Sequence, residues 1–249
     1  MAKSIYQKKL DEILNDIKDM SNKLSSENAG GHKPSLLLHA CCGPCSSYVI
    51  EYLSKFFDIT ILYYNPNIYP KEEYERRLGE LENFLPRFSP AVTERVKLVK
   101  ADYVPAEFYA AVGTENEPEL AKEPEKGERC RRCYELRMKF SYDYAVAHDF
   151  DYFCTTLSIS PFKDAEKINV IGERLAAEGE QLAGEGGKLP GESEQVAKEG
   201  DFGKKSPKWL YSDFKKKGGF LRSLQLSEEY GLYRQQYCGC VFSKNNMVK

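Results

Sequence analysis

The sequence SLLLHACCGPCSSYVI, residues 35–50, decides the fold of this chain. Its first part is a short apolar run, which predicts a buried strand over residues 36–40. Its second part has Pro44 near the start of an apolar segment, which predicts a helix over residues 44–55. The motif HACCGPC therefore joins a strand to a helix. In a parallel sheet such a turn lies at the carboxyl end of the strand, where these folds bind ligands.

The same alternation continues along the chain. Further strands are predicted over residues 58–64, 95–102 and 151–157, and further helices over 71–84, 105–112, 128–148 and 164–177. Alternating strands and helices are typical of a parallel sheet, so the expected fold class is α/β, with a mainly parallel sheet and helices on both faces. A helical, cysteine-bearing C-terminal segment completes the predicted fold.

Two regions depart from this alternation. Residues 1–34 carry apolar side chains at helical spacing, including Ile5, Leu10 and Ile13, and then the polar run SSENAGGHKPS, so they predict a helix and a linker. Residues 178–201 are rich in Gly and Glu, which predicts a disordered surface insertion. We therefore expect a single catalytic α/β domain over residues 35–249.

Composition indicates the cellular compartment of the protein but not its ligand or partner. The net charge of −2 over 249 residues identifies no class of ligand. Met1 begins no apolar run, and nothing approaches the roughly 18 unbroken apolar residues of a membrane span, so we expect a cytoplasmic protein with no membrane partner. Thiols stay reduced in the cytoplasm. A secreted disulfide framework fits poorly, because such frameworks belong to short chains.

The cysteines form three clusters. Seven of the eight lie in HACCGPC, GERCRRCYEL and YCGC, namely Cys41, Cys42, Cys45, Cys130, Cys133, Cys238 and Cys240. The pairs Cys41–Cys42 and Cys130–Cys133 supply four thiolates, which fit either a tetrahedral zinc site or an iron–sulfur cluster. Adjacent cysteines at a strand-to-helix turn are unusual for structural zinc, so the sequence favours iron–sulfur.

The Cys238-Gly-Cys240 motif predicts a different role. A disulfide across this spacing closes a very small ring, so it is strained and easily reduced, which suits a redox-active pair. The alternative is that these two thiols bind a second metal ion. Cys154 is predicted to pack in a strand as a small apolar residue. The roles of Cys45 and His39 stay open.

Five motifs in collinear order carry a family resemblance. HACCGPC, YYNPNIYPKEEYERR, ERCRRCYELRM, TTLSISPFKD and GLYRQQYCGCVFS resemble the cobalamin-independent, iron–sulfur type of epoxyqueuosine reductase, from about residue 36 to 243. The resemblance implies a nucleotide-hydrolase-like α/β fold of the Rossmann-like class. It also implies reduction of epoxyqueuosine to queuosine at the wobble position of tRNA anticodons, the last step of queuosine biosynthesis.

Matched position by position, the resemblance assigns the cysteines. It implies that Cys41, Cys42, Cys130 and Cys133 bind a 4Fe–4S cluster and that Cys238 and Cys240 are the catalytic redox-active pair. It gives Cys45 no cluster role. The implied partners are a tRNA with a queuosine-family anticodon and an electron donor.

Two other functions remain as alternatives. An ATP-dependent tRNA-modifying enzyme of similar fold needs a glycine- and serine-rich phosphate loop, but HACCGPC occupies that position here. A zinc-stabilised RNA-binding module leaves Cys238 and Cys240 without a role.

The segment over residues 204–222 predicts an RNA contact. It holds seven basic residues against one acidic residue, which suits a phosphate backbone. Trp209, Tyr211 and Phe214 lie among the basic residues as possible stacking surfaces for bases. The alternative is that the lysines form an ordinary solvated face and the aromatic residues belong to the core.

Overall fold

The computed structural model describes residues 4–26, 33–185 and 206–246. Within them, five parallel strands form one sheet in the order β3-β2-β1-β4-β5. The strands are β1 (Ser35–His39), β2 (Asp58–Tyr63), β3 (Lys97–Lys100), β4 (Tyr152–Thr155) and β5 (Lys208–Trp209). Helices cover both faces, which confirms the predicted α/β class. The two-residue strand β5 was not predicted.

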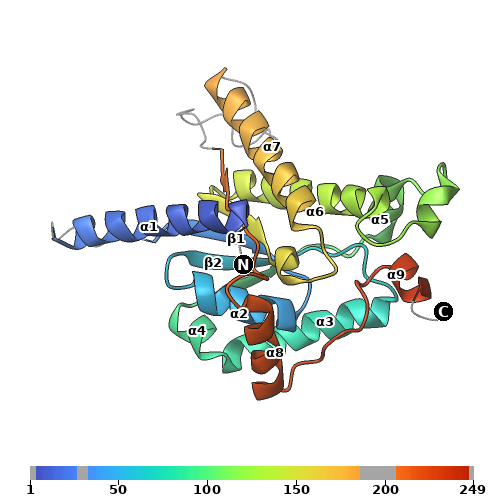
Figure 1. The fold of residues 1–249 in the computed structure, drawn as a ribbon, viewed down its shortest axis with the longest axis horizontal. Helices are drawn as coiled ribbons and strands as arrows, with labels where there is room; N and C mark the ends of the chain where they lie inside the picture. Colours follow the sequence, from blue (N-terminus) through green and yellow to red (C-terminus); the bar gives the residue numbers. More distant parts are fainter. Residues whose placement is uncertain (1–3, 27–32, 186–205, 247–249) are drawn as a thin grey trace.

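The helices form a layer on each side of the sheet (Figure 1). On one side lie α2 (Gly43–Leu53), α3 (Lys71–Phe84), α4 (Ser89–Thr93) and α8 (Gly219–Glu229). On the other side lie α5 (Pro105–Val112), α6 (Glu128–Ala147) and α7 (Ala165–Gly184). The remaining helices are α1 (Ile5–Ser26), α9 (Val241–Asn246) and the 3₁₀ turns Leu85–Arg87, Pro118–Lys122 and Thr156–Ile159.

The central strand β1 separates two hydrophobic cores. Leu36 and Leu38 pack in the core with α2 and α3, whereas Leu37 packs in the core with α6 and α7. Successive side chains of a strand point to opposite faces, so the unbroken LLL run fits a strand that is buried on both sides. This burial fixes the position of the HACCGPC turn that follows β1.

The structure adds detail to two predicted segments, the N-terminal helix and the insertion. The helix α1 extends away from the body (Figure 1), but Leu10 and Leu14 are buried in the same core as β1. The helix α7 continues to Gly184, so the first residues of the segment predicted as a disordered insertion, 178–201, are helical. Glu185 caps that helix, and residues 186–201 lie outside the described residues. No helix in the described part of the chain is both long and apolar enough to cross a bilayer.

Candidate functional site

The strand order places the cysteines at a topological switch point. From the central strand β1 the sheet extends through β2 in one direction and through β4 in the other. In open parallel sheets, the crevice at the carboxyl ends of such strands is the usual ligand site. Cys41 and Cys42 directly follow β1, and the loop that carries Lys163 follows β4 and its 3₁₀ turn. Both segments therefore border the same crevice.

The first thiol group lies at the start of α2. The sulfurs of Cys41, Cys42 and Cys45 all lie within 4.8 Å of one another, and the Cys41 and Cys42 sulfurs are 3.8 Å apart. Cys42 is the N-cap residue of α2 and Cys45 lies in its first turn. Cys45 therefore belongs to the site, a question that the sequence had left open. These three thiols together can hold a metal ion.

The second thiol group joins two distant segments. Cys130 lies in the first turn of α6 and Cys133 in the second, where the sequence had predicted both in the first, and both are buried. They line one small cavity together with Cys238 and Cys240 from the C-terminal segment. Burial raises the pKa of Cys133 to about 11, while the nearby Arg137 acts in the opposite direction. The three cysteine clusters of the sequence thus form two neighbouring groups in space.

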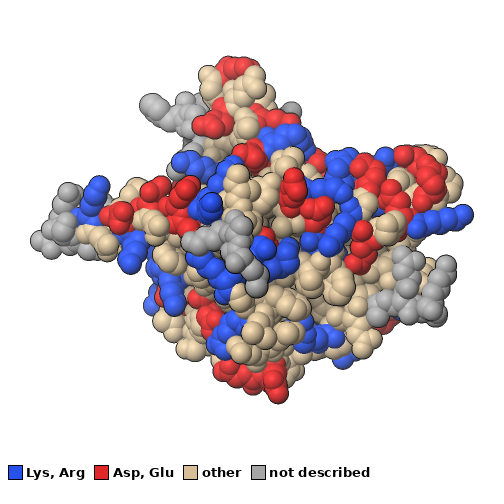
Figure 2. Space-filling model, viewed as in Figure 1, with Lys and Arg blue, Asp and Glu red and all other residues tan. Residues whose placement is uncertain are grey.

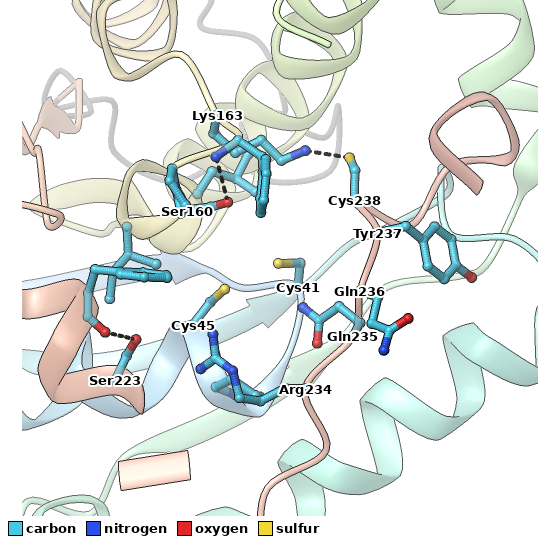
Figure 3. A pocket seen from close by; sticks show the side chains of 16 residues that line it. Cys41, Cys45, Ser160, Lys163, Ser223, Arg234, Gln235, Gln236, Tyr237 and Cys238 are labelled. Atoms are coloured by element: carbon cyan, nitrogen blue, oxygen red, sulfur yellow. Dashed lines mark hydrogen bonds between the residues drawn. The ribbon is translucent and has the colours of Figure 1, made fainter. Parts of the chain in front are cut away.

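Cys238 connects the two groups. It borders the cavity of Cys130 and Cys133, and it also lines a second pocket together with Cys41 and Cys45 (Figure 3). Residues 234–238 form one wall of that second pocket. All of these thiols are free in the structure. Cys238 therefore faces both the thiols at the start of α2 and those at the start of α6.

The loop around Gly239 is held by several hydrogen bonds. Gly239 has φ of 121°, a conformation that side-chain-bearing residues rarely adopt, and its carbonyl accepts from Tyr69 N at 2.7 Å. Arg77 of α3 donates to the carbonyls of Cys238 and Tyr237 at 3.2 and 3.3 Å. Ser243 Oγ accepts from Cys238 N at 3.1 Å. The Cys-Gly-Cys motif is therefore a fixed part of the site.

Four basic side chains are buried around the thiols. Arg77, Arg129 and Arg137 are at most 2 % exposed, and Lys163 is 6 % exposed. Arg77 forms an ion pair with Glu73 at 2.7 Å, and Lys163 donates to the Cys238 sulfur. Buried cations are stable only beside negative charge. Thiolates, or an iron–sulfur group carried on thiolates, supply that charge, so the residues fit the predicted cluster.

Two thiols are already biased toward the thiolate form. Hydrogen bonds from Cys42 and Cys45 hold the pKa of Cys41 well below its usual range, and the positive charges of Arg137 and Arg77 add to this. The pKa of Cys238 is lowered first by the Cys240 thiol and then by the Lys163 ammonium. Each group thus contains one sulfur prepared to act as a ligand or a nucleophile.

His39 is buried next to the thiols and contacts residues of three neighbouring segments. It is fully buried at the end of β1, and its ring nitrogens lie 2.8 Å from Thr155 Oγ1 and 3.0 Å from the carbonyl of Tyr64. Burial, together with the nearby Arg137, lowers the pKa of His39 to about 3, so the ring is neutral. Arg137 Nε donates to His39 Nε2 at 3.2 Å, and Arg137 Nη2 donates to Asn65 at 2.6 Å. His39 is therefore a neutral hydrogen-bond partner that orients Arg137.

Cys154 is separate from these groups. It is fully buried in β4, and its thiol donates to the carbonyl of Leu210 at 3.2 Å. This confirms the prediction that Cys154 packs in a strand. The site residues that the sequence did not reveal are Lys163, Arg137 and Gln235. The only signal was that all three lie inside motifs that carry the family resemblance, namely TTLSISPFKD, ERCRRCYELRM and GLYRQQYCGCVFS.

The predicted stacking role of two aromatic residues is wrong. Trp209 and Phe214 are buried in the two cores on opposite faces of the sheet. Trp209 lies in β5, where alternation turns it inward while Lys208 faces solvent, and its indole donates to Asn169 at 3.0 Å. Tyr211 is half-buried and donates to Glu173. The basic and aromatic residues alternate at Lys208 and Trp209 because β5 is an edge strand with one exposed and one buried residue. This alternation alone does not indicate an RNA-binding surface.

The lysines of the same segment are only partly available to RNA. Lys215 donates to the carbonyl of Ser158 at 3.1 Å and pairs with Asp213, and Lys217 pairs with Asp11 at 2.5 Å. Lys216 is exposed. Positions 204 and 205 lie outside the described residues. On the face in Figure 2, basic and acidic side chains are interspersed and do not form one continuous basic surface.

Comparison with known proteins identifies the family. The family model described as epoxyqueuosine reductase QueH matches residues 36–183 and 191–246. Proteins of that name from Streptococcus pyogenes and Staphylococcus epidermidis are 39 % and 34 % identical to this chain. The matches cover 85 % and 97 % of this chain, and 71 % and 90 % of the relatives. A third, from Staphylococcus aureus, is 35 % identical over 97 % of this chain and 89 % of its own length.

The matched ranges contain every thiol of the two groups. The sequence motifs, the α/β fold and the comparisons therefore agree, and the chain belongs to the epoxyqueuosine reductase QueH family, a family of oxidoreductases.

Proposed function

We propose that this protein reduces epoxyqueuosine to queuosine at the wobble position of tRNA anticodons, as the last step of queuosine biosynthesis. The names of its relatives support the substrate and the reaction class. The observation that carries the proposal is the position of Cys238, which borders both the cavity of Cys130 and Cys133 and the pocket of Cys41 and Cys45. This arrangement puts a dithiol beside a thiolate site that suits a metal cluster.

The proposed cluster ligands are Cys41, Cys42, Cys130 and Cys133. Four thiolates are the usual ligands of a 4Fe–4S cluster, and the buried cations Arg77, Arg137 and Lys163 compensate its negative charge. When bound, the cluster would supply one-electron transfer, and a second metal ion would be the Lewis acid that polarises the epoxide oxygen. Cys45 lies within 4.8 Å of Cys41 and Cys42, so it is available to a second metal ion or as a hydrogen-bond donor to the cluster thiolates.

The dithiol accounts for the electrons and protons. Converting the epoxide to an alkene breaks two C–O bonds and consumes two electrons and two protons, and the oxygen leaves as water. Cys238 and Cys240 supply both electrons when they form a disulfide. One proton comes from the Cys240 thiol. The second comes from Lys163, whose ammonium donates to the Cys238 sulfur and, after the Cys240 thiol, helps to keep that sulfur as a thiolate. An electron donor then reduces the disulfide with two electrons, and Cys240 and Lys163 each regain a proton from solvent, which restores the starting state.

The cluster assignment is tested by iron content and colour. Cys130→Ala and Cys133→Ala are each expected to lose brown absorbance, iron and sulfide after anaerobic reconstitution, because each removes one of four ligands. Cys154→Ala is the matched control, since that thiol is equally buried but lies outside both cavities. Full iron and sulfide in both ligand variants would refute the assignment. A colourless wild-type protein containing zinc would favour the RNA-binding module instead.

The role of the pair is tested separately. Cys238→Ser is expected to keep the iron and sulfide content of the wild type and to lose turnover of epoxyqueuosine-containing tRNA. Cys240→Ser should do the same, because one thiol cannot form the disulfide. Normal turnover of either variant with a chemical reductant would show that the pair is not catalytic.

The proposed substrate is a tRNA whose wobble base leaves the anticodon stack to reach the pocket. Lys216 is exposed in the loop before α8, and Phe220 of α8 lines the pocket. Lys216→Glu is therefore expected to weaken tRNA binding and to reduce the slope of log affinity against log salt by about one, the effect of one lost phosphate contact. Lys97→Glu, on the opposite edge strand β3, is the control. Equal salt slopes for the two variants would place the tRNA contact elsewhere. We place the reaction in the cytosol, where thiols stay reduced.

A further inference from the structure

Two adjacent glutamines precede the Cys-Gly-Cys motif and differ in their surroundings. Both line the pocket of Cys41 and Cys238, but Gln236 is exposed whereas Gln235 is half-buried. In Figure 3 the Gln235 side chain extends from the wall segment toward Cys41, at the thiol end of the pocket. Nothing in the sequence distinguishes the two glutamines, so the fold alone selects Gln235.

The carboxamide of Gln235 has one partner among the described residues. Its Nε2 donates to the sulfur of Cys42 at 2.9 Å. Its Oε1 is fully buried and has no hydrogen-bond partner in the described part of the chain. A buried acceptor without a partner is rare, because the group loses its hydrogen bonds to water and gains none in return.

The chemistry of the neighbouring sulfur fixes the orientation of this amide. A thiolate that binds a metal has no proton to donate, so only the NH₂ group of Gln235 can hydrogen-bond to Cys42 in the loaded protein. The carbonyl oxygen must then stay directed away from that sulfur. Because Gln235 lines the pocket, a bound molecule can supply the missing donor there.

The reaction produces such a donor at this place. An epoxide oxygen carries no hydrogen, but it becomes an O–H group once the ring has opened and one proton has been transferred. We propose that Gln235 is a further catalytic residue, whose NH₂ group hydrogen-bonds to the Cys42 sulfur and whose carbonyl accepts a hydrogen bond from the oxygen released by epoxide opening. This inference rests on the proposed function. The carbonyl bond exists only after the first C–O bond has broken, so it favours turnover over substrate binding.

The experiment uses reconstituted full-length protein and epoxyqueuosine-containing tRNA. Gln235→Met keeps the length of the side chain and removes both polar groups. Gln235→Glu keeps an acceptor and removes the donor. Gln225→Met is the matched control, since that glutamine is exposed on α8 and does not line the pocket of Cys41 and Cys238. The readouts are the midpoint potential of the cluster, kcat and KM.

Both Gln235 variants are expected to lower the midpoint potential, because an N–H···S bond stabilises the more negative reduced cluster. Gln235→Met is expected to lower kcat about tenfold with KM changed less than twofold, and Gln235→Glu to lose less of kcat. Gln225→Met should match the wild type in all three readouts.

The inference fails in several distinct ways. An unchanged midpoint potential in both variants would exclude the bond to Cys42. An unchanged kcat in Gln235→Met, or an effect on KM alone, would exclude the bond to the released oxygen. If the wild-type protein shows neither cluster nor turnover, the proposed function fails and this inference fails with it. If the wild type is active and the variants are unaltered, only the inference fails.

Discussion

Arg77 joins α3 to the Cys-Gly-Cys loop, and we expect Arg77→Lys to loosen that loop. The guanidinium makes three hydrogen bonds that lysine cannot reproduce together. It donates to Glu73 at 2.7 Å and to the carbonyls of Cys238 and Tyr237 at 3.2 and 3.3 Å. A single ammonium can keep the ion pair with Glu73, but it does not span the two carbonyls as the planar fork of arginine does.

The size of the effect follows from the lost bonds. A hydrogen bond from a charged donor contributes ~1.5–3 kcal/mol, and the two carbonyl bonds are long, so we take the lower figure for each. Losing both removes ~3 kcal/mol from the docking of the loop, which corresponds to about a hundredfold more frequent local opening. The bonds from Tyr69 to Gly239 and from Cys238 to Ser243 remain, so the loop should open more often without detaching.

Hydrogen exchange measures this opening directly. In Arg77→Lys, amides around Cys238 should exchange about a hundredfold faster, while amides in β1 and α6 keep their wild-type protection. Turnover should fall, because the dithiol spends less time in the pocket, and iron content should stay unchanged. Arg76→Lys is the control, since Arg76 is exposed and lies over the ring of Tyr233. Unchanged exchange in the loop would show that Arg77 does not hold it, and lost protection throughout the protein would indicate general destabilisation.

Two further predictions concern the core and pH. Gly172→Ala is expected to lower the stability of folding by about 3 kcal/mol, because the new Cβ would lie 2.2 Å from the buried ring of Trp209, whereas Gly184→Ala on the same helix meets nothing within 4 Å and should be neutral or slightly stabilising. Thermal unfolding checks both, and equal midpoints would contradict the packing. Lys163→Met should raise the pKa of Cys238 by removing the positive charge that now helps to lower it, so alkylation of Cys238 in metal-free protein should shift to higher pH. The pair of Lys163 ammonium and Cys238 thiolate contributes its full stability above the unfolded-state pKa of the thiol. This contribution is lost as the pH falls through the lower folded-state pKa of Cys238. The wild type should therefore lose its stability advantage over Lys163→Met in acid. An unchanged alkylation profile would refute this role of Lys163.

Helices and strands were predictable where the hydrophobic pattern and the residues that start or end an element, such as proline, indicate the same bounds. The helices α3 and α5 begin and end at the predicted residues, since each follows a proline or starts with one. The strand β5 was missed because two residues form no recognisable alternation. Its lysine and tryptophan were interpreted as an RNA-binding pattern. A short edge strand with one side facing solvent gives the same sequence of a basic and an aromatic residue.

The thiols of the site were predictable and its charges were not. Cysteines at the ends of predicted elements can be grouped by the rule that ligands bind at the carboxyl ends of parallel strands. Arg77 and Arg137 lie on helices whose sequences are rich in exposed charges, so nothing local indicates that these two are buried. Only the packing of α3 and α6 against the crevice separates the buried arginines from their solvated neighbours.

The order of the chain has a consequence for how the site is filled during synthesis. The four proposed cluster ligands all lie before residue 134, whereas residues 234–238, which form one wall of the pocket, follow roughly one hundred residues later. At translation rates of ~5–20 residues per second, this interval lasts on the order of 5 to 20 s. Throughout it, an emerging chain has its ligands but lacks the wall that later covers them. A metal donor can therefore approach from the side that the C-terminal segment will close, and the ribosome produces a form open to cluster loading before the dithiol exists.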